Sequence, residues 1–447
     1  MSQEAYRSSR VVLPSGVEPA TVIVDGERIA EVVRGERGPA SAHDFGDRVI
    51  APGLVDCHVH VNEPGRTEWE GFETATRAAA AGGVTALVDM PLNSLPVTTT
   101  ADALAQKKAA SAGKCFVDVG FWGGVVPGNQ SALPELAEGG VLGCKAFLVH
   151  SGIDEFPNAT QDDLRQAMPI LRAAGLPLLA HAELDLGADV PLGDARTYSR
   201  YLASRPQRWE DEAIRLLVEL CRETGCAVHI VHLSSASSVP ILRAAKAEGL
   251  PITVETCPHY LCLDAESIPD GATFYKCAPP IRGRDNREAL WRALLEGVID
   301  FVITDHSPCA PELKLPERGD FEQAWGGIAS LQLGLPAIWS EAQQRGADLG
   351  SLFRWMSSAP ATFAGLAGKK GQLLAGSDAD LLVFGPDEPV NVTAESLFFR
   401  HKVSPYVGRS LHGRVHATLL RGRCVYDGAT HLGQPEGRHL LHRRTAA

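Results

Sequence analysis

The sequence has no long apolar run and no excess of basic residues. No stretch approaches the ~18 consecutive apolar residues of a membrane helix, and the opening "MSQEAYRSSRVVLPSG" has no continuous apolar core of a signal peptide. The formal net charge is -12 and the sequence pI is about 5.7. A nucleic-acid binder needs a basic face for phosphates, so this balance disfavours that class. We therefore expect a protein that binds neither membranes nor nucleic acid.

Paired cysteines are also missing. The ten cysteines stand singly, without the C-x-x-C pairs of zinc or redox motifs and without the spacing of a disulfide framework. In a chain of this size without a secretion signal, we expect reduced thiols and a cytoplasmic enzyme. Cys57, Cys144, Cys257 and Cys309 fall in the segments discussed below, where we expect them to be small buried packing residues.

Both ends of the chain read as short strands. "RVVLPSG" and "ATVIVDGERIAEVVRG" near the start alternate apolar and polar residues and include a DG turn signal, and "GQLLAGSDADLLVFG" and "ATLLRGRCVYDG" near the end look similar. Strand-rich segments around a different middle suggest one small β domain built from both termini. We assign residues 1–50 and 371–447 to it.

The middle of the chain, residues 51–370, alternates between apolar runs and helix-like stretches. Eight runs, from "VIAPGLVD" to "VIDFVITD", are mostly separated by segments such as "QDDLRQAMPILRAAG", which have apolar spacing near 3.6 and end in glycine. Eight strands alternating with helices is the count of a (β/α)8 TIM barrel, which is an α/β fold. A doubly wound open sheet is the alternative, but no G-x-G-x-x-G follows the first strand to support it.

Polar residues lie at or near the ends of several of these runs. They are His58 and His60 (first run), Lys145 (fourth), His181 (fifth), His232 (sixth) and Asp305 (eighth). Each has a common structural reading by itself: a buried core histidine, a surface lysine, or a helix N-cap. A barrel of this type builds its active site at the carboxyl ends of its strands, so the six together predict one site at the barrel mouth.

Further histidines lie near the same strand ends. His229 and His232 are three residues apart on one run, so on a regular strand they point to opposite faces. We expect His232 to face the barrel axis and His229 to pack outward against a helix. We expect His150, His259 and His306 to support the site or line its pocket.

Imidazole and carboxylate ligands suit Zn²⁺ and similar divalent ions, with Co²⁺, Mn²⁺ or Fe²⁺ as alternatives. A pair of ions about 3.5–4 Å apart needs a bridging ligand besides water. An ammonium group cannot bridge, but a desolvated neutral lysine can combine with CO2 to form an anionic carbamate with two oxygens. Lys145, surrounded by histidines, is the expected place for that modification.

These motifs resemble the cyclic amidohydrolases of the amidohydrolase superfamily, which include dihydroorotases, hydantoinases and allantoinases. The resemblance covers essentially the whole chain and implies a terminal β-sandwich domain and two divalent metal ions. Carried over residue by residue, the metal ligands are His58, His60, N6-carboxylated Lys145, His181, His232 and Asp305. Long segments such as "HVHVNEPGRTEWEGFETATRAAAAGGVTALVDMPLNSLPVT" and "TDHSPCAPELK" look most like the allantoinase branch.

One position helps to separate the branches. Dihydroorotases carry an arginine two residues after the second histidine of H-x-H, where it binds the substrate carboxylate, and this chain has Asn62. Losing the guanidinium removes a bidentate carboxylate clamp, and an amide suits the neutral ureido group of allantoin better. Asn93 and Ser151 are further candidates for substrate contact, with turn formation or helix capping as the equal alternative. The backbone of Cys277 and Ala278 is expected to contact the ring.

The resemblance implies hydrolysis of the ring amide of (S)-allantoin to allantoate, a step of purine catabolism. Asp305 is expected to accept a proton from the attacking water and donate it to the departing ring nitrogen. The resemblance also implies a homotetramer. The rivals are a hydantoinase, a dihydroorotase, or a non-catalytic scaffold that keeps the barrel, and the complete ligand set argues against the last.

Overall fold

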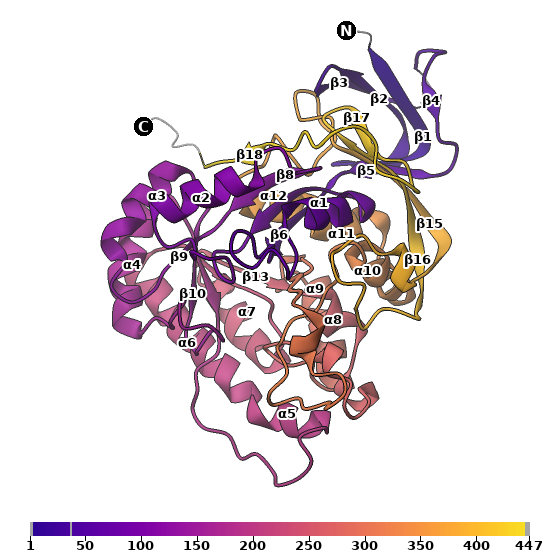
Figure 1. Cartoon of the computed structure of the whole chain (residues 1–447). Coiled ribbons are helices and arrows are strands. Elements are labelled where there is room, and N and C mark those ends of the chain that lie inside the picture. Colours follow the sequence, from indigo (N-terminus) through magenta and orange to yellow (C-terminus); the bar gives the residue numbers. More distant parts are fainter. Residues whose placement is uncertain (1–2, 36–37, 443–447) are drawn as a thin grey trace.

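The computed structural model describes residues 3–35 and 38–442, and the middle of the chain folds into a (β/α)8 barrel (Figure 1). Its strands are all parallel. They are β6 (Leu54–Val59), β7 (Val84–Asp89), β8 with β9 (Asp118–Phe121 and Gly123–Gly124), β10 (Cys144–Phe147), β11 (Leu178–His181), β12 (Val228–Ile230), β13 (Ile252–Thr256) and β14 (Phe301–Val302). The predicted fold class is confirmed.

The barrel closes between its first and last strands. Strands β6, β7 and β8 form one parallel sheet, and β9 to β14 form another. Only Trp122 separates β8 from β9, so one bent segment joins the two sheets. At the other seam, Val59 pairs with His306, and the His60 backbone N–H donates to the His306 carbonyl over 2.8 Å. This seam brings the first and last strand ends, and their polar residues, together.

Helices follow the strands and cover the outside of the barrel. They are α1 (Phe72–Ala81), α2 (Ala101–Ser111), α3 (Leu133–Gly139), α4 (Gln161–Ala173), α6 (Gln207–Thr224), α7 (Val239–Ala247), α9 (Arg284–Leu295) and α10 (Gly334–Ala342). Helix α6 buries Ala213, Leu217 and Leu220 at helical spacing and ends at Gly225, whose φ is 66°. Helix α4 begins with a capping box between Thr160 and Asp163.

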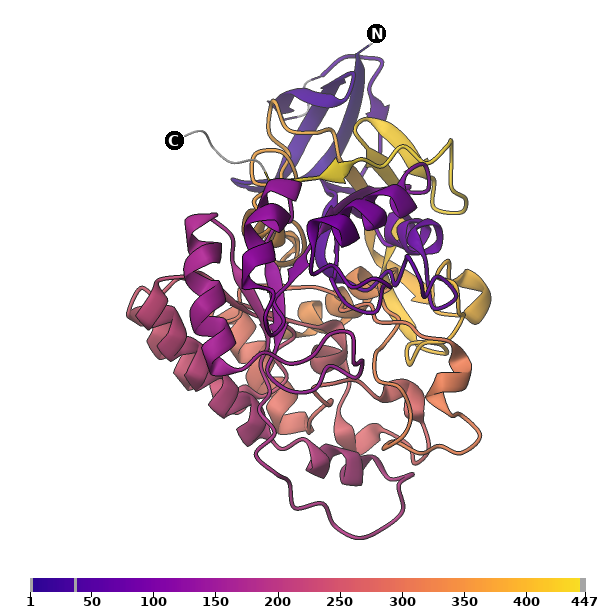
Figure 2. The ribbon, with the colours of Figure 1, turned by 60° about the vertical axis from the view of Figure 1, so that its left-hand side comes forward.

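Shorter helices lie in the loops after the later strands. They are α5 (Tyr198–Ser204) after β11, α8 (Pro258–Cys262) after β13, and α11 (Leu349–Phe353) and α12 (Ala359–Phe363) beyond α10. In the two ribbon views, α5 and the β domain lie at opposite ends of the molecule (Figures 1 and 2). Among the helices of the described residues, none combines the length and the apolar character that crossing a membrane requires.

Both chain ends build a second domain of the β-sandwich type. Its eight strands are hydrogen-bonded into one continuous sheet of order β17-β16-β15-β5-β1-β2-β3, with β4 beside β1. Its strands are β1 (Glu4–Leu13), β2 (Gly16–Asp25), β3 (Arg28–Arg34), β4 (His43–Asp44), β5 (Val49–Pro52), β15 (Leu381–Asn391), β16 (Ser410–Leu420) and β17 (Arg423–Tyr426). Strand β5 pairs with both β1 and β15 and so joins the two ends. Val11, Val22, Ile50, Leu381 and Leu419 form much of a separate apolar core.

The C-terminal tail returns from the β domain to the barrel. Its last described strand, β18 (His439–Leu440), runs parallel to β8 and pairs with it. The predicted domain bounds at residues 50 and 370 stay a prediction.

A buried ionic network joins the β domain to the barrel. Lys370 Nζ lies 2.7 Å from Asp118 Oδ2 at the start of β8, 2.7 Å from Asp380 Oδ2 and 2.9 Å from Asp378 Oδ2. Arg421, after β16, also contacts Asp118. Burial alone would lower the pKa of Lys370, but the three carboxylates raise it above its ordinary value. Because the lysine is fully buried, the network holds a charge that needs all of its partners.

Candidate metal centre

The six residues predicted from the strand ends come together at the barrel mouth. His58 Nε2 and His60 Nε2 lie 3.3 and 3.6 Å from Asp305 Oδ1. The rings of His58 and His232 are 5.3 Å apart, and those of His181 and His232 are 4.7 Å apart. Lys145 is fully buried on β10, between the strands that carry these histidines.

Two of these residues adopt an unusual backbone conformation. His232 has a φ of 40° and Asp305 a φ of 44°, in the left-handed region that non-glycine residues rarely occupy. His232 lies two residues after the end of β12 and Asp305 three residues after the end of β14, where the extended chain turns into a loop. Strain of this kind is held by surrounding structure and clusters at functional sites.

The hydrogen-bond partners of the histidine nitrogens indicate which nitrogens of the cluster are free to bind a metal ion. His58 Nδ1 lies 2.5 Å from Glu255 Oε1, and His181 Nε2 lies 2.6 Å from Glu183 Oε2. An ionised carboxylate only accepts hydrogen bonds, so the imidazole proton sits on His181 Nε2 beside ionised Glu183, and on His58 Nδ1 once a nearby cation ionises Glu255. The other nitrogens then carry lone pairs directed into the cluster: His58 Nε2 lies 3.3 Å from Asp305 Oδ1, and His181 Nδ1 lies 3.0 Å from His232 Nε2. Carboxylates that orient ligating histidines in this way are typical of metal sites.

Unpaired buried nitrogens point to the same conclusion. His58 Nε2, Lys145 Nζ and His232 Nδ1 have no hydrogen-bond partner among the described residues. The candidate ligand atoms of His58, His60 and Asp305 lie within 4.8 Å of one another. Leaving such groups buried and unpaired is unfavourable without a ligand. The donor set therefore fits divalent metal ions.

Burial sets the charge of these groups in the metal-free protein. It lowers the pKa values of His58 and His60 well below the ordinary value, with the Lys145 charge as the next cause, so both imidazoles are neutral. Burial also lowers the pKa of Lys145 to about 8 and raises the pKa of Asp305 to about 7. A neutral imidazole and a readily deprotonated lysine are the forms that metal binding requires.

The sequence predictions did not include two carboxylates that contact the proposed metal ligands. Glu183 follows His181 by two residues in "LLAHAE", and Glu255 lies within the apolar run "ITVET". Both are fully buried. Glu255 also accepts the His232 backbone N–H over 3.3 Å. A glutamate inside an otherwise apolar barrel strand was the available signal, because such a charge needs a partner.

The expectation for His229 was wrong. Its Nε2 lies 3.0 Å from Glu255 Oε2, and its Nδ1 lies 2.8 Å from Thr253 Oγ1, so it faces the same side as Glu255. Its ring packs on Phe301 and Phe363. The argument from strand alternation fails because β12 ends at Ile230, and the positive φ of His232 turns the following residues. His229 and His232 therefore both approach Glu255.

The other three histidines have different surroundings. His150 is exposed and lines the cavity at the mouth, and its Nδ1 accepts the Gly152 N–H. His306 is buried, and its Nδ1 accepts the backbone N–H groups of Ser330 and Leu331. His259 is buried, with no hydrogen-bond partner for either ring nitrogen among the described residues.

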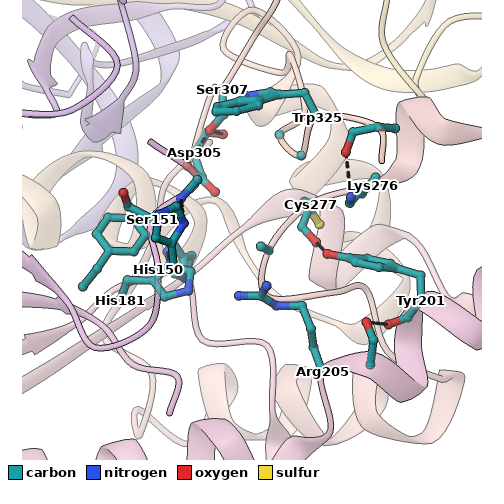
Figure 3. Close-up of a pocket in the computed structure, with 18 of the residues that line it drawn as sticks. His150, Ser151, His181, Tyr201, Arg205, Lys276, Cys277, Asp305, Ser307 and Trp325 are labelled. Carbon is teal, nitrogen blue, oxygen red and sulfur yellow. Dashed lines mark hydrogen bonds between the residues drawn. The ribbon is translucent and has the colours of Figure 1, made fainter. Parts of the chain in front are cut away.

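A cavity of about 640 Å³ opens over the cluster. Asn93, Ser151, Cys277 and Ala278 are among its lining residues, and Ser151 and Cys277 are labelled in Figure 3. The Asn93 Oδ1 atom has no partner among the described residues, whereas the Ser151 hydroxyl donates within its own loop, 2.6 Å to the Phe156 carbonyl. Asn62 is buried, and its Nδ2 donates to the Pro308 carbonyl over 3.2 Å; it is not among the described residues that line this cavity.

The cavity walls come from several loops. Tyr201 Oη donates to the Cys277 carbonyl over 2.6 Å, and Lys276 Nζ donates to the Ala324 carbonyl over 2.6 Å (Figure 3). Arg205 and Trp325 complete opposite parts of the wall. All ten cysteines are free thiols, and Cys57, Cys144, Cys257 and Cys309 are buried, as expected from the sequence.

A barrel whose mouth gathers histidines, a lysine and an aspartate on strand ends defines a class of metal-dependent hydrolases. The sequence pattern of the Amidohydrolase family matches residues 49–425, and the chain belongs to this family. Among curated relatives, an allantoinase of Streptomyces avermitilis is 50% identical over 97% of both chains, and one of Arabidopsis thaliana is 44% identical over 95% of this chain and 88% of its own.

Solved structures agree with the fold. The L-hydantoinase (dihydropyrimidinase) from Arthrobacter aurescens superposes with a TM-score of 0.90 and is 29% identical, over 99% of this chain and all of its own. The two curated relatives are more similar to this chain in sequence than the solved structure is, and both are allantoinases. The solved structure shares the barrel and the β domain.

Proposed function

We propose that this protein is an allantoinase that hydrolyses the cyclic amide of (S)-allantoin to allantoate. The observation that carries the proposal is a set of lone pairs and unpaired buried nitrogens that converge under a cavity, in a chain 50% identical to an allantoinase over nearly its whole length. The proposed metal ligands are His58, His60, carboxylated Lys145, His181, His232 and Asp305.

The residues present would hold two divalent ions, with Zn²⁺ as the default and Co²⁺, Mn²⁺ or Fe²⁺ compatible with the same ligands. When bound, such ions make water acidic enough to attack at neutral pH and withdraw electrons from a carbonyl oxygen. Glu255 and Glu183 fix the rings of His58 and His181, so that one nitrogen of each faces the centre.

Lys145 supplies the bridging ligand in this proposal. Its amine is buried and has no protein hydrogen-bond partner among the described residues, and burial lowers its pKa to about 8. The neutral amine adds to CO2 and releases one proton, which gives a carbamate whose single negative charge is shared by two oxygens. Among the described residues no carboxylate forms a close ion pair with Lys145, although the charges of Asp305 and Glu255 act on it, so the modification would replace a poorly compensated buried ammonium with an anion suited to metal ions.

Asp305 moves the proton. It accepts a proton from the attacking water and donates it to the departing ring nitrogen, as base and then acid. Ser307 Oγ donates to Asp305 Oδ1 over 2.8 Å and restricts the carboxylate. Burial raises the pKa of Asp305 to about 7 in the metal-free protein, which supports a role in proton transfer near neutral pH.

Substrate contacts are proposed on the cavity wall. The unpartnered Asn93 Oδ1 is available to accept from a ring or ureido N–H, and Cys277 and Ala278 line the same cavity. Ser151 is a weaker candidate because its hydroxyl is already used within its loop. Asn62 would act by shaping the loop beside Pro308, and its direct contact with substrate stays a prediction.

Turnover of four cyclic amides tests the function. We expect metal-loaded protein to hydrolyse allantoin with a kcat/KM at least tenfold higher than for hydantoin, dihydrouracil or dihydroorotate. Preference for hydantoin or dihydrouracil would favour the second candidate, a hydantoinase, which the similarity to the A. aurescens structure supports. No turnover of any of them, and no bound metal, would favour a non-catalytic scaffold.

The homotetramer and the cytoplasmic location expected from the sequence stay predictions. Light scattering on the purified protein would give the mass of the assembly directly. A mass near four times the 47.7 kDa of one chain is the expected result.

A further inference from the structure

Arg205 joins the candidate metal centre to the cavity wall. It directly follows helix α5. Its Nε and Nη2 atoms donate to the two carboxylate oxygens of Glu183, over 3.1 and 2.5 Å. Glu183 in turn faces His181 Nε2 at 2.6 Å. This chain of contacts places a guanidinium one side chain away from a proposed metal ligand.

The same guanidinium also borders the cavity. Arg205 is among the lining residues, and its side chain is 21% exposed although most of it is enclosed. Its Nη1 group has no hydrogen-bond partner among the described residues, because the contacts with Glu183 use the opposite edge. In the close-up, the guanidinium points from its helix end toward the side of the cavity that holds His181 (Figure 3).

The charge of Arg205 is already balanced. Glu183 is fully buried, and its two carboxylate oxygens face the Nε and Nη2 groups of Arg205 and the Nε2 atom of His181, so the guanidinium and this carboxylate are matched to each other. A guanidinium paired in this bidentate way with one carboxylate keeps N–H donors on its free edge without requiring a second anion. That edge suits a neutral carbonyl acceptor.

We propose that Arg205 is a specificity-determining residue whose free Nη1 edge binds the ureido carbonyl of the substrate. The inference rests on the proposed function and adds how the site would distinguish allantoin from a bare hydantoin ring. Hydrolysis needs the ring carbonyl over His58, His60 and Asp305. The substituent on the ring then has to occupy the remaining cavity, where the Arg205 edge offers a donor.

Two other cations of the wall are placed differently. Arg200 contacts the half-exposed Glu322 and the Pro191 carbonyl. Lys276 directs its Nζ to the carbonyls of Ala324 and Glu322, over 2.6 and 3.1 Å. Neither contacts Glu183, so neither is tied to the candidate metal centre. Arg200 is therefore a matched control, since its side chain is also 21% exposed in the same cavity.

The test compares the inhibition of allantoin hydrolysis by two compounds that differ by one ureido group, allantoate and ureidoacetate. In Arg205→Lys we expect the inhibition constant of allantoate to rise at least tenfold and that of ureidoacetate to change less than threefold. Arg200→Lys should leave the ratio of the two constants unchanged. Equal rises for both inhibitors in Arg205→Lys would mean that Arg205 acts only through Glu183 and His181, and would overturn the proposal, as would no rise for either.

Metal content of each variant is measured in parallel, because loss of metal from Arg205→Lys would make its inhibition constants uninformative. In that event a crystal structure of the wild-type enzyme with allantoate decides. A ureido oxygen within hydrogen-bond distance of Arg205 Nη1 supports the proposal, and both ureido groups elsewhere overturn it. Failure of the wild-type enzyme to hydrolyse allantoin at all would instead refute the proposed function, which separates the two outcomes.

Discussion

Glu255 Oε1 lies 2.5 Å from His58 Nδ1, although the two residues are 197 positions apart in the chain. The other carboxylate oxygen lies 3.0 Å from His229 Nε2. One glutamate in the barrel interior thus orients a proposed metal ligand and pairs with a second histidine below it. Burial raises the pKa of Glu255 to about 8 in the metal-free protein, so its ionisation depends on a cationic centre nearby.

Replacing this carboxylate tests that link. We expect Glu255→Gln to weaken metal binding by about 10- to 100-fold, the usual effect of losing a carboxylate behind a ligating histidine. Competition with a chelator measures the affinity. Glu388→Gln is the matched control, because Glu388 forms a similar 2.6 Å contact with His416 in the β domain, far from the cluster in the fold. Unchanged metal affinity in Glu255→Gln would contradict the orienting role.

Lys145→Ala should lose bound metal and activity together. The variant removes the amine that we propose as the bridging carbamate, and leaves a space among neutral histidines. Short carboxylic acids added with metal should restore part of the activity, since a carboxylate can occupy that space. Metal analysis and turnover measurements check this, and full metal content with full activity would contradict the carbamate proposal.

Reactivation of metal-free enzyme should depend on pH. Only the neutral amine adds to CO2, and burial lowers the pKa of Lys145 from 10.5 to about 8. At pH 7 this raises the neutral fraction roughly 300-fold. At fixed dissolved CO2 and metal, the initial rate of reactivation should rise with pH and level off above about 8. A rate that does not depend on pH or on CO2 would argue against this step.

Asp305→Ala should keep the fold and lose turnover. General acid–base groups contribute about 10²- to 10⁴-fold to rates, so we expect kcat to fall by at least that range at saturating metal. Circular dichroism and the thermal midpoint should stay close to the wild-type values. Because Asp305 also lies beside His58 and His60, metal content is measured on the same samples. A near-normal kcat would remove Asp305 from the proton-transfer role.

Lys370→Met should destabilise the protein without changing the residues that line the cavity. The substitution leaves the carboxylates of Asp118, Asp378 and Asp380 buried without their shared lysine. Removing one partner of a buried ion pair lowers the free energy of unfolding by about 3–5 kcal/mol. Urea unfolding measures this loss. Lys246→Met, which breaks the more exposed pair with Asp300, is the control. An equal loss of unfolding free energy in the two variants would contradict the prediction that the buried ion pairs of Lys370 contribute more to stability.

Much of the barrel could be predicted from the sequence. Each of the eight apolar runs overlaps one of the barrel strands, because a strand enclosed by helices is apolar on both faces and reads as a continuous run. The strand ends named from the sequence, such as His181 and Asp305, also meet in space, because parallel strands bring their carboxyl ends to one edge.

Contacts between strands were harder to predict. The pairs His181 with Glu183 and His58 with Glu255 depend on side-chain directions and on which strands are neighbours. Arg205 reaches the centre from a loop after α5, which no periodic pattern describes. His229 was misplaced for the same kind of reason, since strand alternation stops where β12 ends at Ile230.

The sequence by itself determined the order of strands and helices and the residues at the strand ends, because hydrophobic periodicity and residue chemistry are local properties. Only the tertiary structure decided which histidine nitrogen faces the centre, which cation borders the cavity, and that Lys370 would gather three carboxylates between two domains. These depend on distances between residues far apart in the chain. Closure of the barrel at Val59 and His306 sets those distances at the mouth.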